Sequence, residues 1–356
     1  MIKQCLVCNI VIEKQSKQWS RQVYCSSKCR KSAHRKKVSQ TSRIQRRRAN
    51  MLQNDEVLYL IRQCQRAKTV QILARHDLKS FLDTMALVRE RPKGPVSLCH
   101  ISPVKGKEEI GLFHCRNLFY GGSYQNKKFS NGYISGGMSI SRSVLSERWH
   151  VSADKTNNEI LLMIEEYLGG DIVRGYLEAS PVRKSKKFQV VKQIIDAEDV
   201  GCFDDLMRLG YKELCAQRDA LYRRRTFQVD PPEESKFLAY VDSLTRFIVY
   251  DAGRAKVLQE IRDLMVIAYM ALERVKESKT YNKYFYVKYE PLIRKEYAYA
   301  RLTRPADWSV FKDLMYELAF KVLQGKEVRL RSVKRKVISF LEFPNKAEAH
   351  GGAKEL

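Results

Sequence analysis

Four cysteines near the start of the chain have the types and spacing of a metal site. They form two close pairs, Cys5 with Cys8 and Cys25 with Cys29, with sixteen residues between the pairs. Two such pairs supply four thiolates, which suit tetrahedral Zn²⁺ and leave no open position for catalysis. In a cytosolic protein, which is the expected class here, such a cluster indicates metal before disulfides. The sequence therefore predicts a structural zinc.

The second cysteine pair is expected at the start of a helix, in the segment SSKCRKSAHRKK. Ser26 or Ser27 is the predicted N-cap, and the positive end of a helix dipole favours the thiolate form of a nearby cysteine. His34 lies a little more than one turn beyond Cys29, so it either replaces a cysteine as ligand or is a solvated side chain. The segment resembles the treble-clef zinc modules of many bacterial and phage proteins, in which CS-x-x-C-R opens the last helix.

A block of positive charge follows the cysteines. Residues 30–48 contain no acidic residue, and single-sign blocks of this kind track the phosphate backbone of nucleic acid. The residues predicted to contact nucleic acid in this block are Arg30, Lys31, Arg35, Lys36, Lys37, Arg46, Arg47 and Arg48. Residues 1–40 are assigned to the zinc module and the start of this basic arm. Residues 41–92 are assigned to the rest of the arm and to connecting helices, with Asn54 as an N-cap.

The whole chain has an excess of positive charge. It contains 66 Lys and Arg against 40 Asp and Glu, which gives a net charge of +26. An excess this large predicts a polyanionic partner, and DNA is the expected one, with RNA left open. The longest apolar run, residues 264–272, is too short for a bilayer and indicates a buried helix, so no membrane partner is expected. The expected location is the cytoplasm, at the nucleoid, of a bacterial or phage-encoded protein.

A second set of polar residues lies in the stretch LCHISPVKGKEEIGLFHCRNLFYGGSYQNKKFSN, residues 98–131. VSLCHISPV is predicted to be a strand, KGKEEIG a charged loop, and LFHCRNLFY a second strand. SYQNKKFSNG is predicted to be a short helix with Ser123 as N-cap and an end near Asn131. His100 then ends the first strand, Asn117 lies in the second, and Asn126 lies on the helix.

This order and spacing resemble the ββα-metal core of the HNH endonuclease family. HISP is similar to that family's HI-x-P, and Asn117 with Asn126 nine residues later is similar to its NL … N-x-x-K. GLFHCRNL also resembles the GLLH-x-x-NL form of many phage and prophage members. The resemblance implies that His100 is the general base, that Asn117 braces the loop that holds it, and that Asn126 is a metal ligand.

The implied chemistry is metal-dependent hydrolysis of a phosphodiester. A histidine with a pKa of about 6.5 activates water at neutral pH, and a divalent cation stabilises the developing charge. An asparagine amide oxygen suits Mg²⁺ or Mn²⁺, which are the expected catalytic cations. Lys127 and Lys128 are expected to clamp the substrate backbone.

Cys99 departs from the family's pattern, in which the residue before the base is usually Asp, His or another metal-binding group. A thiolate is a poor ligand for Mg²⁺ and a good one for softer metals, so Cys99 is either a transition-metal ligand or a small buried residue. If it is buried, the cation is held by Asn126, another nearby group and substrate phosphates, or else the site has decayed. His114 is likewise either a further ligand or a packing residue.

The predicted fold class is α+β, mostly α. A small HNH-like core is expected at residues 93–140, a large helical domain at 150–345 and a disordered tail at 346–356. The helical domain is expected to have apolar stripes that form its core, such as Phe237, Tyr240 and Leu244, and to offer a surface for a protein partner or a second copy. Basic patches recur at residues 182–187, 222–225 and 329–336.

Two functions from different classes fit these patterns. The leading hypothesis is a metal-dependent DNA endonuclease with an HNH-type site. The alternative is a non-catalytic, zinc-containing nucleic-acid-binding protein, such as a regulator or recombination accessory, with a degenerate HNH core. Cys99 is the residue that favours the alternative.

Overall fold

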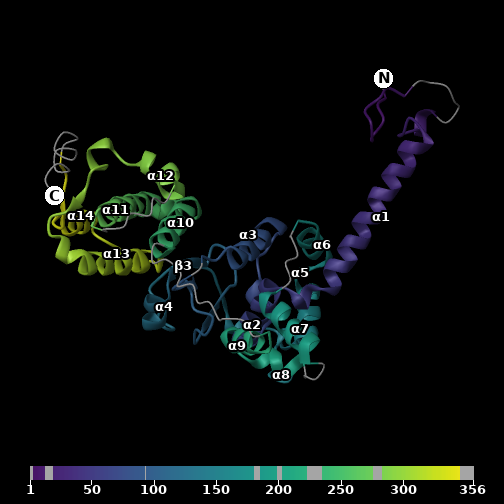
Figure 1. Ribbon diagram of the computed structural model, residues 1–356, viewed down its shortest axis with the longest axis horizontal. Coiled ribbons are helices and arrows are strands. Elements are labelled where there is room, and N and C mark those ends of the chain that lie inside the picture. The colour runs from purple at the N-terminus through teal and green to yellow at the C-terminus, as the bar shows by residue number, and fades with distance from the viewer. Residues whose placement is uncertain are drawn as a thin grey trace.

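The computed structural model describes residues 3–12, 19–92, 94–179, 185–198, 203–222, 235–275 and 283–344. These residues form mostly helices, together with three two-stranded antiparallel sheets. This agrees with the predicted mostly helical α+β class. Helix α1 (Ser27–Ala49) projects away from the body, with the N-terminal residues at its far end and the C-terminal helices on the opposite side of the molecule (Figure 1).

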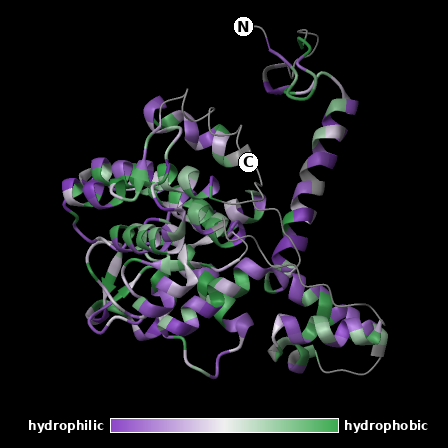
Figure 2. Ribbon diagram, turned by 60° about the vertical axis from the view of Figure 1, so that its left-hand side comes forward, coloured by the Kyte–Doolittle hydropathy of each residue, from purple (hydrophilic) through white to green (hydrophobic). Residues whose placement is uncertain are grey.

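Helix α1 has the composition of a solvent-exposed element. The Ser26 side chain accepts a hydrogen bond from the backbone N–H of Cys29 at 3.3 Å, which confirms one of the two predicted N-caps. Its 23 residues contain no acidic side chain and span about 34 Å at the usual helical rise. Figure 2 shows that most of the helix is hydrophilic. Such a helix has no broad apolar stripe to bury, so it suits solvent or a polar partner.

The first hydrophobic core begins where α1 ends. The Asn54 side chain accepts a hydrogen bond from the backbone N–H of Glu56, which confirms it as an N-cap, and an apolar stripe from Val57 to Cys64 is buried behind it. Two helices from much later in the sequence complete this core. The helices around it are α2 (Asp55–Ala67), α3 (Leu78–Arg89), α5 (Asn157–Leu168) and α6 (Gly170–Ala179).

A ββα element lies between this core and a second one. It consists of β1 (Val96–His100), β3 (Leu118–Gly122) and α4 (Ser123–Phe129), and His100 pairs with Leu118 in the antiparallel register. Side chains alternate across a strand. Leu98 and Tyr120 therefore pack into the first core, whereas Cys99 and Phe119 pack into the second. The hairpin is thus buried on both faces.

The predicted elements of this region need three corrections. The second strand is β3, at residues 118–122, and residues 112–117 do not form a strand with it. The predicted charged loop contains β2 (Glu109–Gly111), which pairs with β4 (Ser139–Ser141). Ser123 is the first residue of α4, and Gly122 before it is the N-cap; the Ser123 hydroxyl lies 2.8 Å from the Ser97 hydroxyl of β1.

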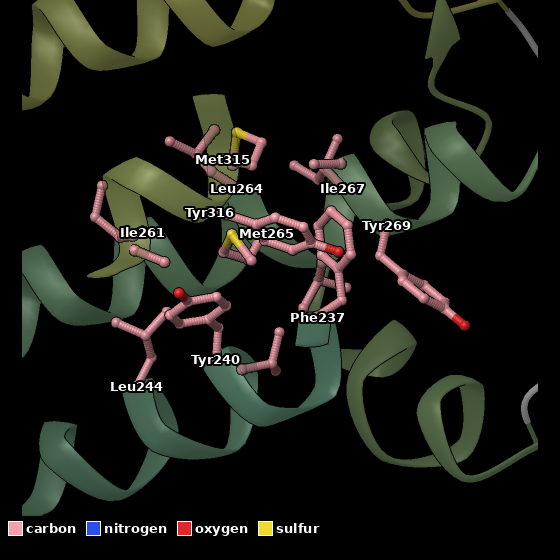
Figure 3. Close-up of a cluster of buried hydrophobic side chains, with 14 of the residues drawn as sticks. Phe237, Tyr240, Leu244, Ile261, Leu264, Met265, Ile267, Tyr269, Met315 and Tyr316 are labelled. Atoms are coloured by element: carbon pink, nitrogen blue, oxygen red, sulfur yellow. The ribbon is translucent and has the colours of Figure 1, made fainter. Parts of the chain in front are cut away.

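The second core is formed by the C-terminal helices. The predicted stripe of α10 (Ser235–Tyr250) is buried in it, and Figure 3 shows Phe237, Tyr240 and Leu244 meeting side chains of two other helices, among them Met265 and Tyr316. The remaining elements of this part are α11 (Ala255–Glu273), α12 (Lys283–Tyr289), α13 (Trp308–Leu323), α14 (Leu330–Ile338) and the paired strands β5 (Arg301–Leu302) and β6 (Leu341–Glu342).

A third, small core is formed by three helices between the other two cores in sequence: α7 (Lys186–Glu198), α8 (Phe203–Arg208) and α9 (Tyr211–Leu221). The helices at residues 150–345 are therefore shared among three cores. The predicted tail at 346–356 lies outside the described residues. Short 3-10 turns join the elements at Trp19–Arg21, Met51–Gln53, Val70–Leu73, Arg142–Val144, Glu147–Trp149, Ala252–Arg254, Glu290–Leu292, Lys295–Tyr297 and Pro305–Asp307.

Candidate functional site

The four N-terminal cysteines lie together at the tip of α1. Their Sγ atoms are all within 4.8 Å of one another. The Sγ atoms of Cys8 and Cys25 are 3.4 Å apart, those of Cys25 and Cys29 3.5 Å, and those of Cys29 and Cys8 3.8 Å. Zinc–sulfur bonds of about 2.3 Å place tetrahedral thiolates at about this spacing. The donor set fits Zn²⁺.

Local backbone structure brings these cysteines together. The first pair sits on a tight turn, in which the backbone N–H of Cys5 donates to the carbonyl of Ile10 at 2.9 Å and Asn9 adopts a left-handed φ of 57°. Burial raises the pKa of Cys5, but hydrogen bonds from backbone N–H groups, chiefly that of Cys25, outweigh burial and lower it to about 6. His34 is exposed and lies outside the cysteine cluster.

The basic arm is exposed near its tip and attached at its base. Arg30, Lys31, Arg35, Lys36 and Arg46 are exposed, and the side chain of Lys37 lies outside the description. Arg47 donates to the carbonyls of Leu177 and Glu178 in α6, at 2.5 and 3.0 Å. Arg48 forms an ion pair with Glu165 of α5 at 2.5 Å. Two of the cations predicted to contact nucleic acid thus have partners that hold α1 to the body.

His100 ends β1, as predicted, on the same strand face as Leu98. The residue is partly exposed, but its Nε2 atom is buried and has no hydrogen-bond partner. Its ring centroid is 6.3 Å from that of Phe113, and its carbonyl accepts a hydrogen bond from Gln324 at 2.9 Å. Burial, and then the positive charge of Arg66, lower the pKa of His100 to about 3. The imidazole is therefore neutral at physiological pH and a weak base.

Asn117 is fully buried and ties together the loop that follows His100. Its Oδ1 accepts hydrogen bonds from the backbone N–H groups of Ser102 (2.9 Å) and Met138 (3.1 Å). Its Nδ2 donates to the carbonyls of Ser102 (3.1 Å) and Leu112 (2.8 Å). Gly137 adopts φ +78°, and a Cβ there would lie 2.4 Å from Oδ1. One amide therefore connects the residues after β1, the turn before β3 and the segment before β4.

Cys99 faces away from His100. Its side chain is 1% exposed and packs in the second core beside Phe119, and a Cβ on Gly121 would lie 3.1 Å from its Sγ. Burial raises the pKa of the thiol above its usual range. Among the described residues, the N-terminal cysteines are the one group of His, Cys, Asp or Glu side chains close enough to hold a metal. Of the two alternatives for Cys99, metal ligand or small buried residue, its geometry therefore matches the buried residue.

Helix α4 packs on both strands of the hairpin and presents the remaining predicted residues. Asn126 is half-buried, and Lys127 and Lys128 are exposed. Lys128 lies 3.7 Å from Glu317 of α13, so α4 also contacts the C-terminal helices. His100 thus ends β1, Asn117 immediately precedes β3 and Asn126 lies on α4.

His114 is packed rather than open to solvent. Its side chain is 3% exposed and stacks on His76, with ring centroids 4.6 Å apart. Its Nδ1 accepts a hydrogen bond from the backbone N–H of Arg116 at 3.1 Å. Burial and the charge of His76 lower the pKa of His114 to about 4. This environment matches the packing alternative for His114.

Three residues of α10 form hydrogen bonds with the backbone in and just before β3; the sequence indicated Tyr240 only as a core residue and did not single out Ser243 or Arg246. The Tyr240 hydroxyl accepts from the N–H of Gly122 at 2.8 Å, and the Ser243 hydroxyl accepts from the N–H of Tyr120 at 2.9 Å. Arg246 donates to the carbonyls of Cys115 and Leu118, both at 2.6 Å. Their spacing of three residues puts them on one helix face, but nothing local in the sequence indicates which strand that face meets.

Comparison with known protein families, curated proteins and solved structures found no match to this chain. Among the described residues, no helix combines the length and apolar character of a membrane span.

Proposed function

We propose that this protein binds nucleic acid and that the cysteine cluster and α1 grip the duplex backbone. The observation that carries the proposal is a cysteine cluster with zinc-binding geometry at the tip of a 23-residue helix that contains no acidic residue. Zinc, when bound, would fix the fold of so small a segment. Exposed cations along α1 would then neutralise successive phosphates. The net charge of +26 supports the same partner.

The test is to replace Arg30, Lys31 and Arg35, all exposed near the tip of α1, by alanine. Duplex affinity should fall, and the slope of log K against log salt should become shallower by about 0.9 for each lost phosphate contact. The matched control replaces Arg329, Arg331 and Arg335, exposed residues at the start of or within α14, and so removes the same charge elsewhere. Equal losses in the two variants would mean that affinity follows net charge alone and would contradict the role of the arm.

A second proposal is phosphodiester hydrolysis at an HNH-type site around His100. The observation that favours it is Asn117, whose four hydrogen bonds make the brace that the resemblance requires. The set of predicted ligands for a divalent cation is incomplete. Asn126 can still offer its amide oxygen, but the Cys99 thiol lies in an apolar core. The lowered pKa of His100 favours the non-catalytic alternative.

A nicking assay on supercoiled plasmid separates these two possibilities. Wild type and His100→Ala are incubated with Mg²⁺, Mn²⁺ or Ni²⁺ in turn. Hydrolysis at this site predicts that the wild type nicks the plasmid with at least one metal and that His100→Ala loses at least about a hundredfold in rate. Equal activity, or none, in both proteins and in every metal would exclude hydrolysis at His100 and leave the binding proposal intact.

A further inference from the structure

A cleft of about 780 Å³ opens beside the ββα element. Its walls are α2, the end of α3 and the residues after it, β1, and the starts of α7 and α9. Figure 1 shows α2, α7 and α9 close together in the body. The volume is that of a site for a small ligand, and a double helix is too wide to enter it.

The cleft is lined by more cations than carboxylates. The cations are Arg62, Arg89, Arg91, Lys186 and Lys187, and the carboxylates are Asp55 and Glu56. Both carboxylates already have partners. Glu56 accepts from the Tyr176 hydroxyl and pairs with Arg89 at 3.4 Å, and Asp55 accepts from the backbone N–H of Lys186 at 3.4 Å. Five cations against two carboxylates leave an excess of positive charge in the lining.

Arg62 and Lys187 line the cleft from two different helices. Arg62 is exposed on α2, and Lys187 is half-buried at the start of α7, where its Nζ donates to the carbonyl of Met207 at 2.5 Å. Burial, and then the charge of Arg62, lower the pKa of Lys187, while the charge of Glu213 raises it. A cleft lined by an excess of one sign of charge attracts ions of the opposite sign, here an anion.

Two tyrosines stand among the cations. Tyr59 is half-buried on α2, with the Arg62 guanidinium 5.9 Å from its ring centroid. Tyr211, at the start of α9, is 46% exposed. Aromatic rings beside cations are the usual platform for unpaired bases, because every base has a face on which a ring can stack.

His100 lies behind one wall of the cleft. Leu98 lines it and lies two residues before His100 on the same face of β1. The fully buried ring of Phe113 packs between the two places, with its centroid 6.0 Å from that of Tyr59 and 6.3 Å from that of His100. A chain held in the cleft would therefore meet β1 at Leu98, with His100 separated from it by the buried Phe113 side chain.

We propose that this cleft binds an unpaired segment of nucleic acid, with Arg62 and Arg91 on phosphates and Tyr211 against a base. The inference rests on the proposed nucleic-acid binding and adds a substrate class to it, because the arm grips a duplex and the cleft admits a single strand. The protein would then be directed to junctions between paired and unpaired DNA.

The test measures binding of a fluorescent oligothymidylate of about 20 nucleotides and of a blunt duplex to the full chain by anisotropy, without added divalent metal. Arg62→Ala/Arg91→Ala should weaken single-strand binding about tenfold and make its salt slope shallower by about 1.4, which is two phosphates at about 0.7 each. Duplex binding should change less than about twofold, since its phosphates meet the arm. Arg331→Ala/Arg335→Ala is the charge-matched control and should leave both affinities near wild type.

Tyr211 tests the stacking contact separately. Tyr211→Ala should weaken single-strand binding about fivefold, the low end for one base–aromatic stack, whereas Tyr211→Phe should keep wild-type affinity. Equal single-strand affinity in wild type and Arg62→Ala/Arg91→Ala, or an equal loss in the control pair, would contradict single-strand binding in the cleft. Wild-type protein that binds duplex but no single strand would contradict this inference alone. Wild-type protein that binds neither would contradict the proposed function as well.

Discussion

Helix α1 is exposed over most of its length, whereas all five residues of β3 are buried. The tip of α1 is organised locally, by a cap at Ser26 and two cysteine pairs close in sequence. The edge of β3 is organised from a distance, since Gly122 is bonded by Tyr240 and Tyr120 by Ser243. The two regions should therefore fail in different ways, the first through loss of a metal and the second through loss of remote contacts.

Loss of zinc should give the largest effect and should be confined to the first region. Cys8→Ala removes one of four thiolates, and structural zinc supplies about 10 kcal/mol or more to the folding of such modules. Elemental analysis should find stoichiometric zinc in wild type and a loss of it in the variant. Duplex binding should fall at least about tenfold, and thermal unfolding of the three cores should stay unchanged.

Cys215→Ala is the matched control, because Cys215 is half-buried and lies outside the cluster. It should keep both zinc content and duplex affinity. Wild-type protein without zinc, or unfolding of the cores on chelation, would contradict the separation between the regions.

Asn117→Ala should give the next largest effect, in the second region. It leaves two backbone N–H groups and two carbonyls buried without their partner, which costs about 3–5 kcal/mol at the usual penalty for unpaired buried groups. Asn126→Ala, half-buried on α4, should stay within about 0.5 kcal/mol. Urea unfolding followed by fluorescence measures both. Similar losses in the two variants would mean that Asn117 does not organise the loop.

Local patterns explain what could be predicted from the sequence. The N-caps at Ser26 and Asn54, the convergence of the cysteines and the pair of strands β1 and β3 followed by α4 each depend on residues close in the chain. The buried stripe of α10 was also predicted, because its spacing alone marks one face as apolar. These features need no knowledge of what lies opposite.

The remaining features depend on partners far apart in sequence. The sequence predicts that Arg47 and Arg48 contact phosphates. In the structure Arg47 bonds to α6 and Arg48 to α5, each more than a hundred positions away. Cys99 could be either ligand or core residue until the second core was placed against its face of β1. The cleft beside Tyr59 and Tyr211 joins segments from four regions of the chain, so no periodicity indicates it.

Ser243→Ala should give a smaller effect, about 1–2 kcal/mol, because it leaves the N–H and carbonyl of Tyr120 without a side-chain partner. Amide hydrogen exchange should accelerate at Tyr120. Thr245→Ala is the control on the same helix, since its hydroxyl donates to the Val241 carbonyl of α10 itself at 2.8 Å. If exchange at Tyr120 were equally fast in both variants, the edge of β3 would not depend on α10.

The pH dependence of His100 should give the smallest effect. Its pKa is lowered to about 3 in the folded chain, against about 6.5 when unfolded, so the unfolded chain takes up the proton first as the pH falls. The stability contributed is complete above about pH 6.5 and is lost as the pH falls towards 3, with about 1 kcal/mol gone at about pH 5.5. His114, whose pKa is lowered to about 4, acts in the same direction.

The measurement is therefore the difference between wild type and His100→Gln, each unfolded in urea at about pH 7.5 and about pH 5.5. The variant should lose about 1 kcal/mol less than wild type over this interval. Equal losses would mean that His100 titrates as a solvated side chain, and the end of β1 would then be as open to water as the tip of α1.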